Sequence, residues 1–159
     1  MGAQLIAHAL GAEVRKNPVK EIGWFELNVT TASRLDPIFS GMRPGEPVFH
    51  WHSETFDLPP GAELLACSRR CANQAFRIGR HVYGLQFHLE ATPEMIADWY
   101  QQDVNCGDVR ELDAPLDPNK YSARLAELSR LVFGRWCDNV LQTRVRAAVN
   151  HGEESQSEV

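Results

Sequence analysis

His88 and Glu90 are the residues whose types and spacing most directly suggest chemistry in this sequence. They end a strand-like run, 82–90, and side chains two residues apart on a strand point to the same face. The imidazole and the carboxylate can therefore lie side by side. A carboxylate in that place fixes the tautomer of the imidazole and raises its basicity, as a general base that activates a nucleophile requires. The same spacing is also common in structural hydrogen bonds, so the surroundings of the pair decide its interpretation.

Those surroundings resemble a known signature. Residues 84–93, Gly-Leu-Gln-Phe-His-Leu-Glu-Ala-Thr-Pro, are similar to the Gln-Phe-His-Pro-Glu signature of the class I, triad-type glutamine amidotransferases, which include the glutaminase domains of GMP synthase and carbamoyl phosphate synthetase. Residues 2–7, Gly-Ala-Gln-Leu-Ile-Ala, resemble the segment that follows the nucleophile of this family, Gly-x-Cys-x-Gly-x-Gln. In that alignment Met1 stands directly after the cysteine, and the cysteine itself would precede the chain.

The resemblance implies a role for each matching residue. In the family, a cysteine thiolate attacks the side-chain amide of glutamine and gives a glutamyl thioester and ammonia. His88 would be the base and Glu90 its orienting partner. Met1 and Gly2 would belong to the substrate-binding segment, because the backbone N–H after the cysteine helps to hold the developing oxyanion. Gln4 matches a glutamine that contacts the substrate, although a residue of the helix surface accounts for it equally well.

A second segment, 50–56, resembles the loop whose backbone lines the glutamine pocket of the family. It would place His52 and Ser53 beside the α-amino and α-carboxyl groups of the substrate. His52 falls where the family usually has histidine, and Ser53 falls where it often has glycine. For His50 we expect a buried, hydrogen-bonded place in the core.

None of the cysteines in the sequence is predicted to replace the missing nucleophile. They are spread along the chain without a Cys-x-x-Cys pair, which favours reduced thiols over a zinc site or disulfides. Cys71 lies beside two arginines, a setting that can lower the pKa of a thiol, but no strand-to-helix turn precedes it. We therefore expect the chain alone to have no glutaminase activity. The four cysteines are Cys67, Cys71, Cys106 and Cys137.

The composition favours one soluble domain. The chain has 159 residues, of which 43% are apolar and 23% charged. Its net charge of −5, without a basic run, argues against nucleic acid or an anionic membrane as a partner. No apolar stretch approaches the roughly 18 residues of a membrane span, and no signal peptide is evident. These features predict a cytoplasmic protein, and the chemistry proposed above needs no cofactor.

The resemblance implies an α/β, flavodoxin-like class I amidotransferase fold, present here as its C-terminal portion only, with a long C-terminal helix. We expect a partial amidotransferase domain over 1–104, a linker loop over 105–119, a helix packing on the domain over 120–150 and a disordered tail over 151–159. In the family the sheet is parallel, and the nucleophile sits between a central strand and its helix. Without those strands the chain should be hard to keep folded alone.

Local patterns predict the elements that position the site. Residues 2–10 have helical spacing, and 92–103 has favourable first-turn residues in Thr92 and Pro93. Three short strands over 63–68, 73–78 and 82–89 predict an antiparallel meander.

Three functions remain open. The first is glutamine hydrolysis, with glutamine as the substrate and with ammonia passed to a synthase domain or subunit. The second is a non-catalytic remnant that binds glutamine or a partner. The third is a cupin-like metal enzyme, in which His50, His52, Glu54 and His88 would bind iron, manganese or zinc. Helices at 2–10 and 92–103 do not suit the all-β barrel that this third function requires.

Overall fold

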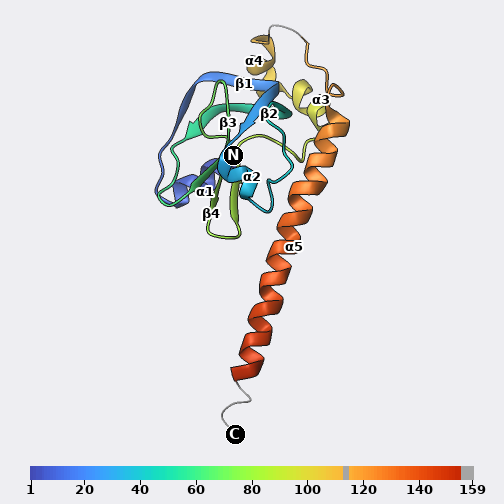
Figure 1. Cartoon of the computed structure of the whole chain (residues 1–159). Helices are drawn as coiled ribbons and strands as arrows, with labels where there is room; N and C mark the ends of the chain where they lie inside the picture. The colour runs from blue at the N-terminus through green and yellow to red at the C-terminus, as the bar shows by residue number, and fades with distance from the viewer. Residues whose placement is uncertain (113–114, 155–159) are drawn as a thin grey trace.

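The computed structural model describes residues 1–112 and 115–154, with side chains described up to residue 143. Its centre is a curled antiparallel sheet, which carries short helices at its margins and one long helix along its side (Figure 1). In the described chain the five strands of this sheet run in the order β2-β1-β3-β4-β5. Their bounds are β1 Val14–Val29, β2 Glu46–Phe56, β3 Glu63–Ser68, β4 Ala75–Ile78 and β5 Val82–Leu85.

Short connections explain why the sheet is antiparallel. Only the turns 69–74 and 79–81 separate β3, β4 and β5, and Gly79 takes the left-handed φ of +58° that such a turn needs. Parallel strands would require crossovers of a dozen or more residues. The meander predicted for 63–89 is therefore confirmed, whereas the described strands contain no parallel pair of the kind that the family's central sheet led us to expect.

The curl of the sheet brings its two ends together. The backbone N–H of His88 donates to the carbonyl of Phe49 at 2.8 Å, and these two residues form an antiparallel bridge. The strand predicted over 82–89 ends at Leu85, and the segment after it joins β2 through this bridge. His88 is thus fixed between β5 and the middle of β2.

The helices on either side of the candidate site follow the predicted patterns. Helix α1 spans Gly2–Ala9, and Gly11 follows it with a left-handed φ of +85°. Helix α3 spans Pro93–Gln101, and the Thr92 hydroxyl accepts a hydrogen bond from the backbone N–H of Met95 at 3.3 Å. A short helix that the sequence analysis missed, α2, spans Thr31–Leu35.

The long helix α5, Ser122–Glu154, packs its first turns against the sheet and continues beyond it (Figure 1). Leu125, Leu128 and Val132 are buried in the main core. The Arg124 guanidinium binds the buried Glu46 carboxylate at the start of β2 with two contacts, of 2.8 and 2.7 Å. These contacts make the predicted C-terminal helix part of the domain.

The connection before α5 is more regular than the predicted loop. It contains a single 3₁₀ turn, Asp103–Asn105, and helix α4, Cys106–Arg110. Of the predicted disordered tail, residues 151–154 belong to α5, and residues 155–159 lie outside the described part of the chain, as do 113–114. Among the described helices, none has both the length and the apolar composition of a membrane span.

Candidate active site

His88 and Glu90 form the pair that their spacing predicts. The Nδ1 atom of His88 lies 2.6 Å from Oε1 of Glu90, and since a carboxylate accepts, Nδ1 carries the donated hydrogen. The other ring nitrogen, Nε2, is then the basic one. The His88 side chain is 20% exposed, and the Trp99 ring packs edge-on against it at 5.3 Å between centroids.

The Glu90 carboxyl is suited to orient this ring. Burial raises the pKa of Glu90, but the hydrogen bond from His88 and the charge of the amino terminus contribute to a net shift below its usual value. Glu90 is therefore ionised at neutral pH. The effect of the amino terminus also places the start of the chain close to the pair.

A pocket of about 330 Å³ lies beside His88, and five of the predicted site residues line it. The structure brings them together from three separate parts of the chain: the start of α1, the second half of β2 and the segment after β5. Glu90 stands behind His88, and Gly2 is exposed in the first turn of α1 without lining the pocket. The five residues are Met1, Gln4, His52, Ser53 and His88.

The remaining wall comes from residues that the sequence analysis did not assign to the site. Trp51 and Trp99 meet edge to face, 6.1 Å apart, and Gln102 and Asn105 add side-chain amides. Asn105 is held by its own amide, which donates to the carbonyl of Trp99 at 2.8 Å. Trp99 belongs to the apolar stripe of the helix predicted over 92–103, so its sequence pattern indicated only core packing. The pocket thus combines aromatic walls with a few polar groups, as small-molecule sites commonly do.

The two histidines of β2 have different environments. His52 is 7% exposed, and both of its ring nitrogens lie near oxygen atoms of the protein: Nε2 is 3.1 Å from Oε2 of Glu21, and Nδ1 is 3.0 Å from the carbonyl of Glu54. His50 is fully buried, as predicted, but neither of its ring nitrogens has a hydrogen-bond partner, so the expected hydrogen bond is absent. Burial lowers the pKa of His50 to about 3, and the ring is neutral at physiological pH.

The family of the chain follows from its sequence match. The family profile described as "Glutamine amidotransferase class-I" matches residues 1–102. The chain belongs to this family. The resemblance on which the site was predicted is therefore confirmed.

Relatives of this amidotransferase chain are longer than the chain itself. It is 38% identical, over 96 residues, to the glutamine amidotransferase-like protein YfeJ of Salmonella typhimurium, covering 60% of this chain and 40% of that protein. It is 33% identical, over 93 residues, to the glutamine-hydrolysing GMP synthase of Cytophaga hutchinsonii, covering 57% of this chain and 18% of that enzyme. The chain thus spans less than half the length of these relatives.

Solved structures support the α/β amidotransferase fold class. A glutamine amidotransferase from Thermotoga maritima superposes with a TM-score of 0.74 and 28% identity, covering 84% of this chain and 58% of that one. A glutamine amidotransferase from Methylobacillus flagellatus gives a TM-score of 0.69 at 28% identity, covering 86% and 59%. The cupin-like alternative is not supported, because both the family match and these neighbours indicate an amidotransferase domain.

Residues that could hold a metal differ from the predicted set. In the described chain, Glu21, His50 and His52 place one ligand atom each within 4.8 Å of one another, whereas Glu54 is exposed and outside this group. The Glu21 carboxylate already accepts hydrogen bonds from Ser68 and Gln74. Its charge is thereby compensated by hydrogen bonds of the amidotransferase chain itself.

Cys71 has the character of a structural thiol. It is 2% exposed, burial raises the pKa of its thiol, and its Sγ lies 3.2 Å from the Thr55 hydroxyl. Among the described residues no cysteine lines the pocket of His88. A replacement nucleophile at Cys71, already disfavoured by the sequence, has no geometric support.

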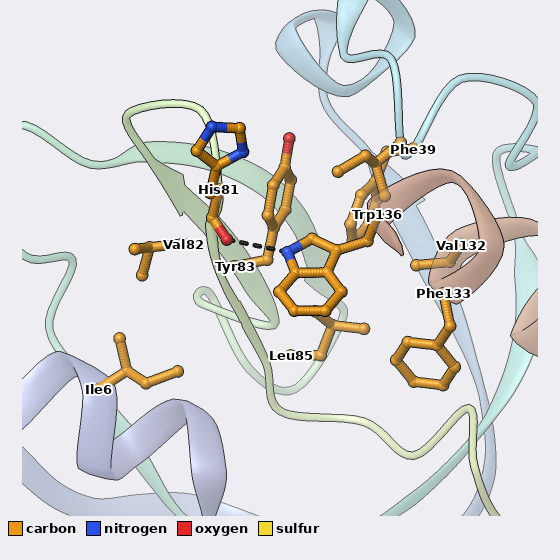
Figure 2. A pocket seen from close by; sticks show the side chains of 10 residues that line it. Ile6, Phe39, His81, Val82, Tyr83, Leu85, Val132, Phe133 and Trp136 are labelled. Carbon is orange, nitrogen blue, oxygen red and sulfur yellow. Dashed lines mark hydrogen bonds between the residues drawn. The ribbon is translucent and has the colours of Figure 1, made fainter. Parts of the chain in front are cut away.

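A second cavity of the chain has a different character. It measures about 380 Å³ and lies between α1, β5 and α5, where Ile6, Leu85 and Phe133 point into it (Figure 2). The hydrogen bond drawn there runs from the Trp136 indole N–H to the backbone carbonyl of His81, at 2.8 Å. This apolar cavity has no group placed to act as a base on a substrate, so we assign the chemistry to the pocket of His88.

Proposed function

We propose that the pocket of His88 binds glutamine, and that His88, oriented by Glu90, is the base that activates a cysteine thiol for hydrolysis of glutamine to glutamate and ammonia. One observation carries this proposal. Residues chosen from three separated sequence segments, represented by Gln4, Ser53 and His88, line a single pocket of a size suited to a small molecule.

The geometry of the pair suits the proton transfers of this reaction. Because Nδ1–H of His88 donates to Glu90, the free Nε2 can take the thiol proton. The thiolate then attacks the amide carbon of glutamine, the C–N bond breaks, and ammonia leaves with the proton that His88 returns. Water hydrolyses the resulting thioester to glutamate and regenerates the thiol. Backbone N–H groups at the start of α1 would hold the oxyanion.

The thiol in this proposal comes from outside the 159 residues, directly ahead of Met1. This placement follows from the alignment of Gly2 and Gln4 with the segment after the family's cysteine, and from the absence of cysteines among the described residues of the pocket wall. The chain alone would then bind glutamine without hydrolysing it, which is the second function that the sequence left open.

The acceptor of the ammonia would be a synthase domain or subunit. GMP synthases that hydrolyse glutamine are among the relatives, including one from Methanobrevibacter smithii, at 34% identity over 92 residues. Such an acceptor fits a domain whose pocket handles glutamine alone. A thiol nucleophile and four free cysteines suit a reducing compartment, and we place the protein in the cytoplasm.

Adding a thiol at the proposed position tests this function. In a chain extended by Gly-Xaa-Cys ahead of Met1, His88 should lower the pKa of the new thiol and speed its alkylation by iodoacetamide near pH 6. The rate should fall roughly 10- to 100-fold with His88→Ala, because the thiolate fraction drops. Mass spectrometry of the N-terminal peptide measures this rate separately from the native cysteines.

A matched control uses another imidazole of the same helix region. His8→Ala removes an exposed histidine of α1 and should leave the alkylation rate unchanged. Calorimetry on the unextended chain should detect glutamine binding, and ammonia release should appear only in the extended form. An alkylation rate that is the same with and without His88 would contradict the proposal.

A further inference from the structure

A buried carboxylate that has no role in the reaction described above lies directly behind the pocket. Glu21 is 1% exposed and sits on β1, where its Cα is paired with that of His52 across the antiparallel ladder. Paired residues of neighbouring strands place their side chains on the same face. A register shift between Lys16 and Glu21 sets this alignment.

Both oxygens of Glu21 are engaged. Oε1 accepts a hydrogen bond from the Ser68 hydroxyl at 2.7 Å, and Oε2 accepts one from the Gln74 amide at 2.6 Å. Oε2 also lies 3.1 Å from Nε2 of His52. Burial raises the pKa of Glu21, but the hydrogen bonds from His52 and Ser68 contribute to a net shift below its ordinary value, so the group is a buried carboxylate.

The opposite edge of the His52 ring faces the pocket wall. Nδ1 lies 3.0 Å from the carbonyl oxygen of Glu54, and the Gln86 amide donates to the same oxygen at 2.6 Å. Ser53 and Glu54 both line the pocket. A continuous series of contacts therefore runs from the Glu21 carboxylate, through the His52 ring, to the backbone of the pocket wall.

We propose that Glu21 is a positioning residue of the glutamine pocket, which acts through His52 to hold the backbone of Ser53 and Glu54 in the geometry that binds the substrate. This inference rests on the function proposed above. Backbone groups that bind a small polar ligand are effective only when they are fixed before it arrives. Glu21 and Gln86 fix the same carbonyl from two sides, one through His52 and the other directly.

A metal ion is the competing explanation for the same cluster. Glu21, His50 and His52 lie close enough to bind one, and His50 has no other partner. The hydrogen bonds from Ser68 and Gln74 favour positioning, because they occupy the Glu21 oxygens that an ion would need. A stoichiometric ion in the purified protein that is lost with His50→Ala would overturn the proposal.

The first test compares two glutamates of the same strand. Glu21→Gln keeps the size of the side chain but removes its charge, while Glu26→Gln makes the same change at an exposed position of β1. Calorimetric titration with glutamine should show at least tenfold weaker binding for Glu21→Gln and unchanged binding for Glu26→Gln. Thermal unfolding of each variant shows that the comparison is made between folded proteins. Equal affinity of Glu21→Gln and the parent chain would overturn the proposal.

A second measurement does not depend on the ligand. In ¹H–¹⁵N spectra of the free protein, Glu21→Gln should shift the ring nitrogens of His52 and the backbone amides of Ser53 and Glu54, whereas Glu26→Gln should leave all of these in place. If the parent chain binds no glutamine, the proposed function fails, and these spectra still decide the positioning role. Unchanged amides at 53 and 54 would overturn that role.

A third variant covers the case in which Glu21→Gln does not fold. Gln86→Met removes the other hydrogen bond to the Glu54 carbonyl and leaves the contact between Glu21 and His52 intact. We expect it to weaken glutamine binding severalfold and to shift the Ser53 amide. A folded Gln86→Met protein with the parent affinity and spectrum would overturn the proposal.

Discussion

The pocket of His88 and the apolar cavity of Figure 2 are similar in size, about 330 and 380 Å³, but are built in opposite ways. The pocket wall is fixed by hydrogen bonds that lead back to buried charges such as Glu21. The cavity wall is fixed by packing, with Trp136 donating its one hydrogen bond to a backbone carbonyl. Substitutions around the pocket should therefore change glutamine binding, and substitutions around the cavity should change stability.

The two regions share elements, which makes this contrast testable. Helix α1 presents Gln4 to the pocket and Ile6 to the cavity. Strand β5 contributes Leu85 to the cavity, and His88 follows three positions later in the pocket. Helix α5, in contrast, contributes described side chains to the cavity only.

The largest effect on stability is expected for Arg124→Met, at the base of α5. This change leaves the Glu46 carboxylate, which is 3% exposed, without its cationic partner. Breaking such a buried pair costs about 3 kcal/mol of unfolding free energy. Urea unfolding measures this loss, and Arg130→Met, an exposed change on the same helix, is the control. Weaker glutamine binding by folded Arg124→Met protein would break the separation between the two regions.

Gly84→Ala should affect both regions, because it lies on the strand that they share. A Cβ at this position would lie 2.6 Å from Cζ of the buried Phe76 ring, which packs against Phe56. Overpacking of this kind costs about 2 kcal/mol. The shift of β5 should also move His88 and weaken glutamine binding. The double variant with Phe76→Leu should recover part of both losses, and additive losses would contradict the steric explanation.

His50→Leu should alter the pH dependence of stability. The pKa of His50 is about 3 in the folded protein, against an ordinary value of 6.5, so between these values the unfolded chain binds a proton that the folded chain does not. Stability is therefore lost as the pH falls below 6.5, by about 1.4 kcal/mol per pH unit. Urea unfolding at pH 7 and pH 5.5 should show a smaller acid loss for His50→Leu, and an equal loss would show that His50 is not the titrating group.

Local and short-range features of the sequence were sufficient to predict several parts of the structure. Thr92 and Pro93 predicted the start of α3, because a capping residue acts within one turn. The two-residue spacing of His88 and Glu90 predicted their contact, although the backbone there is a bridge to β2 and not a continuous strand.

Longer-range features were not accessible to the same reasoning. Glu21 was not assigned to the site, because its place opposite His52 depends on a register shift between β1 and β2 that no local pattern reveals. Trp99 was assigned to the core of its helix, because helical spacing does not distinguish a core face from a pocket wall. The antiparallel sheet departed from the family's central sheet, because these strands are joined by turns too short for crossovers.

The smallest effects come from making the same substitution, Trp to Phe, in both regions. Trp136→Phe removes the N–H that donates to the His81 carbonyl, but the side chain is 39% exposed and water can replace the lost donor. The expected loss is about 0.5–1 kcal/mol of unfolding free energy, with glutamine binding unchanged.

Trp99→Phe, in the pocket, should do the reverse, because Trp99 contacts the ring of His88. Glutamine binding should weaken a fewfold, since a smaller ring no longer fills the space beside His88. Calorimetry with glutamine and urea unfolding, applied to both variants, separate the two outcomes. If Trp136→Phe weakened glutamine binding as much as Trp99→Phe, the two regions would be coupled through β5, and assigning the chemistry to one of them alone would be wrong.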